Sequence, residues 1–356
     1  MKKVKRLLTL LLTVAMILSA CSMPAGTASK EEKLKPGILL CGEMHSDDIS
    51  IENELKLWGE YYAKGARHLF IECSYVEGCF LNEWMKAEDD EILDQIWADT
   101  EGTQGCQENT YNFWKTIKKD YPETIFHATD IGHQYYSIGK RYLEFLETNG
   151  RKDTEEYELV MQDCKQGEKF YELGDKEAFD YREECMISNF IREYEKVKGE
   201  FVMGIYGDAH VDLEGEMYYG TGKMDNMGKQ LKAKYGDLLT TVCVYYAEPV
   251  REDEIEVAGK TYKATYYGSK NVKKWNWNDY VSLDYWRLED AYEDFKDCRA
   301  NYGMSLYYYD FPMKVELNQI FIVDFTLRDG TVERMYMRSD GLKLEGCYAV
   351  MEIEIE

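Results

Sequence analysis

The sequence predicts an α/β fold: a three-layer, mainly parallel sheet flanked by helices, with a β-rich C-terminal extension. Short apolar runs predict five strands, at 37–43, 68–73, 124–130, 201–210 and 239–249. Each run is continuously apolar rather than alternating, as in strands that are covered on both faces. Helical patterns lie between the runs, and strand–helix–strand alternation favours a parallel sheet.

The helices between these strands are predicted from their ends and their periodicity. Residues 47–66 begin with acidic side chains, which suit a helix N-terminus, and end near Gly65. Residues 133–150 end on a glycine, a favourable C-terminal stop. Apolar side chains recur at helical spacing within 175–199, and a shorter helix is expected over 224–236.

The pattern changes from about Glu252. Segments 253–268 and 319–341 alternate apolar and polar residues, and Asp329-Gly330 predicts a hairpin turn. We therefore expect 36–251 to form the α/β domain and 252–356 a β-rich region, either a second small domain or an extension of the sheet edge. The many aromatic side chains of this region are expected to fill a core or pair across strands, with a binding face as the alternative.

The first twenty residues are predicted to be a secretory signal. A basic start, from Lys2 to Arg6, precedes an apolar stretch that is short for a membrane span. LSAC at 18–21 resembles the lipobox of bacterial lipoproteins, which makes Cys21 the acylated residue (palmitate is an expected acyl chain) and 21–35 a tether. The expected location is extracytoplasmic, with a lipid anchor in a bacterial membrane. An uncleaved anchor helix is the alternative.

Charge and cysteine content narrow the class of protein. The formal net charge of −24 repels nucleic acid, so the expected partners are a small-molecule or peptide substrate and, through the lipid on Cys21, a membrane. The ten cysteines show no CxxC spacing that would suggest a metal site. Cys41, Cys73, Cys185 and Cys243 are expected to be buried thiols inside helices or strands, and a local Cys73–Cys79 pair is the alternative.

Reactive side chains gather where the predicted strands end, which is where open α/β sheets bind ligands. These residues are Glu43, His45, Glu72, Asp130, His133, Asp208 and His210. Glu43 and His45 are two residues apart and should point to one side of an extended chain, and the same holds for Asp208 and His210. The other histidines are not expected in the site, because His68 begins its strand and His127 lies within one.

These residues resemble a known family. Two G-x-x-H motifs, GEMH at 42–45 and GDAH at 207–210, occur with a Glu that ends the second strand. This set is similar to the erythromycin esterase and ChaN-like superfamily, which includes the TraB and TIKI proteins. YREECMISNF at 181–190 resembles the R-x-x-x-M-x-x-N helix of that superfamily. The resemblance covers about 37–249.

The resemblance implies roles for individual residues. His45 and His210 match the motif histidines, Glu43 and Glu72 the acids, and Arg182 the helix arginine. Asp130, His133 and Asp208 are added as a secondary set from their places at strand ends.

Hydrolysis of an ester, amide or peptide bond is the expected function. His45 is the expected base, oriented by Glu72 or Asp130, because an imidazole with an ordinary pKa near ~6.5 accepts a proton around neutral pH. Arg182 is expected to neutralise an oxyanion or hold a substrate carboxylate, and His210 to be a second proton carrier.

Two alternatives stay open. His45, Glu72 and His210 suit a divalent metal such as Zn or Mn, so that hydrolysis with and without a metal are both consistent with the residues. The alternative function, which the resemblance to ChaN-like proteins implies, is a non-catalytic lipoprotein that binds haem, iron or another small ligand.

Overall fold

The computed structural model describes residues 34–213, 220–272, 279–344 and 347–355. The predicted signal at 1–20, the acylation at Cys21 and most of the predicted tether lie outside these residues. Among the helices of the described part of the chain, none has the length and apolar character that a bilayer span requires.

A five-stranded parallel sheet forms the centre of the α/β region, in the order β3-β2-β4-β1-β5. The strands are β1 (Gly37–Glu43), β2 (His68–Ser74), β3 (Ile125–Asp130), β4 (Phe201–Gly207) and β5 (Leu239–Cys243). The prediction of a parallel sheet is confirmed. The fourth strand ends three residues earlier than predicted, because Asp208 begins a helical turn.

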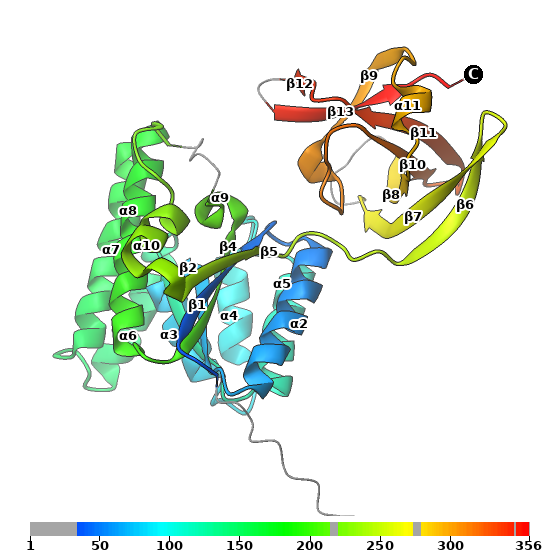
Figure 1. Cartoon of the computed structure of the whole chain (residues 1–356). Coiled ribbons are helices and arrows are strands. Elements are labelled where there is room, and N and C mark those ends of the chain that lie inside the picture. The colour runs from blue at the N-terminus through cyan, green and yellow to red at the C-terminus, as the bar shows by residue number, and fades with distance from the viewer. Residues whose placement is uncertain (1–33, 214–219, 273–278, 345–346, 356) are drawn as a thin grey trace, which may run out of the picture. The chain divides into compact units, whose positions relative to one another are not determined.

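Helices cover both faces of this sheet (Figure 1). Their bounds are α2 (Asp48–Ala63), α3 (Tyr75–Trp84), α4 (Glu91–Asp99), α5 (Glu108–Asp120), η1 (Tyr135–Gly139), α6 (Lys140–Thr148), α7 (Glu155–Leu173), α8 (Asp175–Lys196), α9 (Asp208–Val211), α10 (Met227–Tyr235) and η2 (Gly236–Leu238). On one face, Phe190 of α8 and Met227 of α10 pack against Leu40 of β1 in a fully buried cluster. The opposite face is covered by α2, whose Trp58 is also fully buried.

The start of α2 fixes the chain just after the first strand. The side chain of Asp47 accepts hydrogen bonds from the backbone N–H groups of Ile49 and Ser50, as a helix cap does. The Ser50 hydroxyl in turn accepts from the N–H of Met44 at 3.2 Å. The segment between Glu43 and the helix is therefore held at both of its ends.

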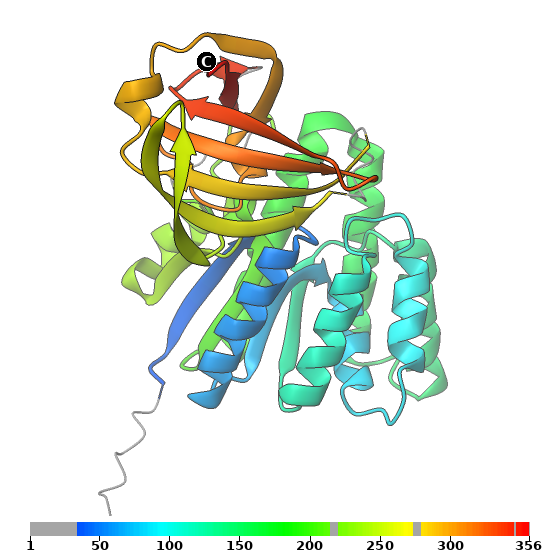
Figure 2. The same ribbon diagram turned by 90° about the vertical axis from the view of Figure 1, so that its right-hand side faces the viewer.

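The C-terminal region is a separate antiparallel sheet of eight strands, seven of them in the order β12-β13-β11-β10-β8-β7-β6, with β9 paired to β13 (Figure 2). Its elements are β6 (Arg251–Val257), β7 (Lys260–Asn271), β8 (Tyr280–Leu288), α11 (Tyr292–Phe295), β9 (Ala300–Tyr307), η4 (Tyr308–Asp310), β10 (Gln319–Leu327), β11 (Val332–Ser339), β12 (Lys343–Leu344) and β13 (Cys347–Ile353). It is not an extension of the edge of the parallel sheet.

Aromatic side chains of this region serve its own packing. Phe321 and Phe325 of β10 are fully buried in one cluster, and Tyr266 lies opposite Trp286 on the neighbouring strand with ring centroids 4.5 Å apart. The predicted hairpin turn is also present, with Gly330 at a φ of 87°. Core packing and cross-strand pairing thus account for these rings, as predicted.

The cysteines whose side chains the structure describes are free thiols. Of the four expected to be buried, Cys41 and Cys185 are buried and Cys73 is half-buried, but the expectation is wrong for Cys243, which is exposed. Cys73 and Cys79 are both free thiols, so the local pair considered from the sequence does not form.

Candidate functional site

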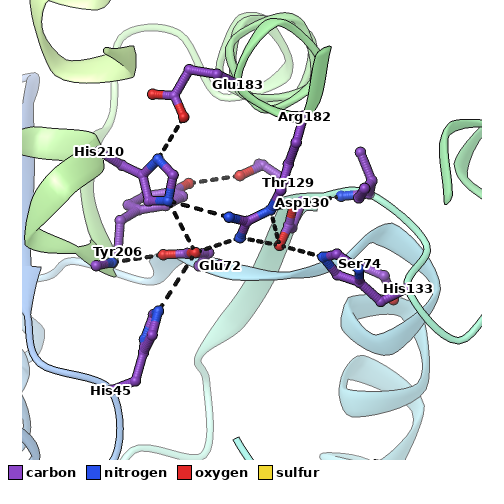
Figure 3. A network of polar contacts seen from close by, with 12 residues as sticks. His45, Glu72, Ser74, Thr129, Asp130, His133, Arg182, Glu183, Tyr206 and His210 are labelled. Atoms are coloured by element: carbon purple, nitrogen blue, oxygen red, sulfur yellow. Dashed lines mark hydrogen bonds and ion pairs between the residues drawn. The ribbon is translucent and has the colours of Figure 1, made fainter. Parts of the chain in front are cut away.

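The predicted site residues come to the carboxyl end of the parallel sheet from different elements: some end strands and others lie on helices. Glu43 and Asp130 are the last residues of β1 and β3, and Glu72 lies near the end of β2. His210 lies on α9, immediately after β4, and Arg182 reaches the same place from α8 (Figure 3).

Glu72 is the centre of the cluster. Its Oε1 accepts a hydrogen bond from Arg182 Nη2 at 2.5 Å. The same oxygen lies 3.4 Å from His210 Nε2 and 3.8 Å from His45 Nε2. Its Oε2 accepts from the backbone N–H of Gly207 at 2.6 Å. With 6% of its side chain exposed, this carboxylate depends on these neighbours to offset the loss of water.

Arg182 joins two buried carboxylates. Its Nε donates to Asp130 Oδ1 at 2.9 Å and its Nη2 to Asp130 Oδ2 at 2.7 Å, while Nη2 also reaches Glu72. Its Nη1 lies 3.4 Å from His210 Nε2. The guanidinium therefore orders Asp130 and Glu72, which departs from the expectation that it meets an oxyanion or a substrate carboxylate.

His210 is enclosed between two acids. Its Nδ1 lies 2.5 Å from Glu183 Oε2, and 12% of its side chain is exposed. Glu183 is fully buried, and its other oxygen accepts from the N–H of Met227. Sequence reasoning did not identify Glu183. The available signal was its position next to Arg182 in the helix motif.

His45 is the histidine of the cluster that solvent reaches. Its Nδ1 contacts Glu43 Oε1 and its Nε2 faces Glu72, yet 40% of its side chain is exposed. A Cβ added to Gly207 would lie 3.2 Å from His45 Cε1 and Nε2, so a glycine at this position leaves the face of the ring open.

The charges around the two imidazoles raise their pKa values. Desolvation lowers the pKa of His45, but attraction to Glu72 and the hydrogen bond to Glu43 outweigh it and raise the pKa to about 9. For His210, burial is outweighed by Glu72 and Glu183, and its pKa rises to about 10. Both rings are thus protonated at neutral pH, unlike the ordinary imidazole expected from the sequence.

The carboxylates show the reciprocal effect. Burial alone would raise the pKa of Glu72, but His210, His45 and Arg182 hold it well below its usual range. Asp130 behaves in the same way, since the Arg182 guanidinium and His133 outweigh its burial and lower its pKa. Both acids stay ionised across the physiological range.

Of the secondary residues, His133 lies close to the cluster and Asp208 does not take part in its contacts. His133 lies beside the cluster, with its Nε2 3.5 Å from Asp130 Oδ2 and its Nδ1 3.1 Å from the Tyr171 hydroxyl. Asp208 instead accepts a hydrogen bond from the Tyr245 hydroxyl at 3.1 Å. The expectation that Asp208 and His210 share one side of an extended chain is wrong, because α9 winds them around a helical turn.

The cluster does not fit a divalent metal in this arrangement. Within the described ranges, no three His, Cys, Asp or Glu side chains are placed to hold a metal ion together. Arg182 supplies a physical reason, because its guanidinium binds Glu72 Oε1, the oxygen that His45 and His210 also face. A fixed cation at the shared ligand disfavours a second one.

Comparison with known proteins gives a distant likeness in fold. No family model and no curated protein matches the sequence. Similar solved structures include a Bacillus cereus protein with a TM-score of 0.42 and 12% identity over 65% of this chain and 71% of that one. A succinoglycan biosynthesis protein has a TM-score of 0.44 and 10% identity over 70% and 76% of the two chains.

An erythromycin esterase mutant in its open conformation is also similar, with a TM-score of 0.37 and 9% identity over 65% of this chain and 76% of that chain. At these identities and scores, the likeness does not assign an activity to this chain.

Proposed function

We propose that this chain is a hydrolase of ester or amide bonds, peptide bonds included, and that His45 is its base. The observation that supports the proposal is the position of this one ring. His45 has a carboxylate at each ring nitrogen, Glu43 at Nδ1 and Glu72 at Nε2, and it is still 40% exposed. An oriented imidazole with access to solvent is suited to proton transfer.

Glu43 selects the useful tautomer of His45. When the ring is neutral, Nδ1–H donates to Glu43 and the lone pair of Nε2 points towards Glu72. The 3.8 Å between Nε2 and Glu72 Oε1 is too long for a hydrogen bond but short enough for one water to contact both atoms.

In the proposed reaction, this water loses a proton to Nε2 of His45 as its oxygen bonds to the carbonyl carbon of the substrate. The ionised Glu72 accepts the second hydrogen of the water and orients its lone pair. The His45 imidazolium then returns the proton to the leaving alcohol or amine as the carbonyl–heteroatom bond breaks, which restores the neutral ring. Arg182, His210 and Asp130 are positioning residues that do not need to touch substrate, because Arg182 and His210 contact Glu72 and Asp130 holds Arg182.

The pH dependence of the rate tests this assignment. Because the base must be neutral and its pKa is about 9, kcat/KM for 4-nitrophenyl acetate should rise tenfold per pH unit below that value and level off near it. A rate that levels off near pH 6.5 would show that an ordinary imidazole, and not His45 in this setting, is the base.

We also propose that the chain is anchored outside the cytoplasm through a lipid on Cys21. Support comes from the lipobox-like LSAC sequence at 18–21. A Cys21→Ser variant should move from the membrane fraction to the soluble fraction and lose incorporation of labelled palmitate. Retention of both membrane association and label would contradict the proposal.

A further inference from the structure

The residue that follows His45 has an unusual backbone conformation. Ser46 has a φ of 59°, in the left-handed region that residues other than glycine rarely adopt. Such a conformation is strained and persists only where the surrounding contacts hold it. The contacts of Ser46 therefore indicate what its conformation does for the neighbouring histidine.

His45 and Ser46 form the corner of a β-turn between β1 and α2. The backbone N–H of Asp47 donates to the carbonyl of Met44 at 2.9 Å, which closes the turn. His45 is not among the residues with a positive φ, so of the two corner residues only Ser46 is left-handed, as in a type II turn. Glycine or asparagine usually occupies that corner, because a Cβ is crowded there.

The chain is held on both sides of this turn. Glu43, just before it, pairs with Gly207 of β4 in the parallel sheet. Asp47, just after it, caps α2 through its side chain. The dihedral angles of the turn therefore determine where the ring of His45 lies. In the observed turn, this ring contacts Glu43 through Nδ1 and faces Glu72 through Nε2.

The loop between α4 and α5, together with the first turn of α5, supplies the contacts that hold Ser46. The Ser46 hydroxyl donates to the carbonyl of Gln104 at 2.5 Å and lies 3.3 Å from the Thr110 hydroxyl. Asn109 Nδ2 donates to the carbonyl of Ser46 at 2.9 Å and to Asp48 Oδ1 at 2.7 Å. We call Gln104, Asn109 and Thr110 the clamp. It binds both the side chain and the backbone of Ser46.

These contacts explain why a serine is useful where a glycine would be less strained. A glycine would adopt the same φ easily, but it would lack the hydroxyl that binds Gln104. The clamp side chains are amides and a hydroxyl, which do not titrate. They can therefore fix the position of His45 but do not act as acids or bases themselves.

We infer that Ser46 is a positioning residue: bound to the clamp, it keeps the turn in the conformation that sets His45 between Glu43 and Glu72. The effect of Ser46 on a reaction rate rests on the proposed hydrolase function. Its effect on the turn does not.

Amide hydrogen exchange of Asp47, measured by NMR on the full chain, tests the turn without a substrate. Ser46→Ala keeps the crowded Cβ and removes the hydroxyl, so exchange at Asp47 should become about 5- to 10-fold faster. Asn109→Ala should have a similar effect. Thr103→Ala is the control, because its hydroxyl donates to Thr100 within the same loop, and exchange should stay as in wild type. Unchanged exchange in both Ser46→Ala and Asn109→Ala would overturn the inference.

Kinetics distinguish positioning of the base from a purely structural role. For 4-nitrophenyl acetate, Ser46→Ala should lower kcat by about 10- to 100-fold and leave KM within about twofold, because a misplaced base affects the transition state more than substrate binding. Ser46→Asn should recover kcat to within about threefold of wild type, since asparagine tolerates a positive φ and its amide can donate to Gln104. If Ser46→Asn were as slow as Ser46→Ala, the left-handed turn would not be what the rate depends on, and the inference would fail.

The two measurements separate this inference from the proposed function. If the wild type does not hydrolyse the ester while Ser46→Ala still speeds exchange at Asp47, the hydrolase function fails and the role of Ser46 in the turn stands. If exchange is faster in Ser46→Ala but its kcat equals that of wild type, the positioning role fails and the hydrolase function stands.

Discussion

The two ends of the parallel sheet both combine imidazoles with carboxylates, but in opposite ways. At the carboxyl end, His45 and His210 each face Glu72 and a second acid. At the amino end, His68 Nδ1 lies 3.0 Å from His127 Nε2 on the neighbouring strand. His127 in turn faces Glu193 Oε2 at 3.5 Å.

Because the partners differ, the pKa values of the rings shift in opposite directions at the two ends of the sheet. Burial, together with the neighbouring His127, lowers the pKa of His68, whereas acids raise those of His45 and His210. At both ends the buried acid is ionised, since the pKa of Glu193 falls to about 2 despite its burial, through hydrogen bonds from His127 and Arg192. The two ends of the sheet therefore do not differ in residue type. They differ in the side chains that each imidazole ring faces.

The largest expected contrast is in turnover. His45→Ala should lower kcat for 4-nitrophenyl acetate by about 10²- to 10⁴-fold, because the base is removed. The thermal midpoint should fall at neutral pH, because the protonated ring stabilises the folded state, but the fold should persist since the ring is 40% exposed. His68→Ala, at the other end, is the control and should keep kcat within about twofold. Full activity of the His45 variant would exclude it as the base.

Stability gives the next contrast, between two arginines. Arg182→Ala leaves Asp130 and Glu72 buried without their shared cation and should lower the free energy of unfolding by about 3–5 kcal/mol. Arg192→Ala removes a partner from Glu193, which Lys196 still contacts at 3.0 Å, so the loss should be about 1 kcal/mol. Urea denaturation measures both, and equal losses would show that Arg182 is not the cation on which buried charge depends.

The pH dependence of the melting temperature should have opposite signs for the histidines at the two ends of the sheet. A raised pKa means that the folded state holds the proton more tightly. The contribution of His45 and His210 is therefore complete below the unfolded pKa of ~6.5 and is lost as the pH rises through 9 and 10. The lowered pKa of His68 has the opposite consequence, and stability is lost as the pH falls below ~6.5.

Two variants check these signs by differential scanning fluorimetry. His45→Gln should flatten the alkaline decline, and His68→Gln should flatten the acid decline without altering the alkaline one. A reduced alkaline decline in the His68 variant would mean that the amino-end pair, not the site, carries it.

The smallest effect is expected at Asp208. Its carboxyl is held by the Tyr245 hydroxyl, apart from the Glu72 contacts, and burial raises its pKa. Asp208→Asn still accepts that hydrogen bond, so kcat/KM should stay within about threefold and stability within about 0.5 kcal/mol. A hundredfold loss of kcat/KM would show that Asp208 takes part in the reaction.

The sheet and much of its carboxyl-end cluster were predictable because they depend on local patterns. Continuous apolar runs predict buried parallel strands, and residues at the ends of such strands meet at one edge. That logic placed Glu43, Glu72 and Asp130 correctly. It failed at Asp208, where the chain leaves β4 directly into a helical turn and the two-residue period of a strand no longer applies.

The pKa shifts of the site were not predictable, because they depend on distances between segments far apart in the chain. The pKa of His45 depends on Glu72, on another strand, and Arg182 is occupied because Asp130 comes from a third. The spacing of neighbouring residues in the sequence does not indicate any of these close contacts.

The absence of a side chain at Gly207 suggests a charge-neutral way to test the proposed reaction. Its N–H donates to Glu72, and an added methyl group would stand 3.2 Å from the His45 ring and 3.5 Å from Glu72 Oε2. An alanine there would occupy space between acid and imidazole while every ionisable group stays in the chain. Because no ionisable group is removed, a loss of turnover in this variant would show that the space between His45 and Glu72 is itself needed for the proposed reaction.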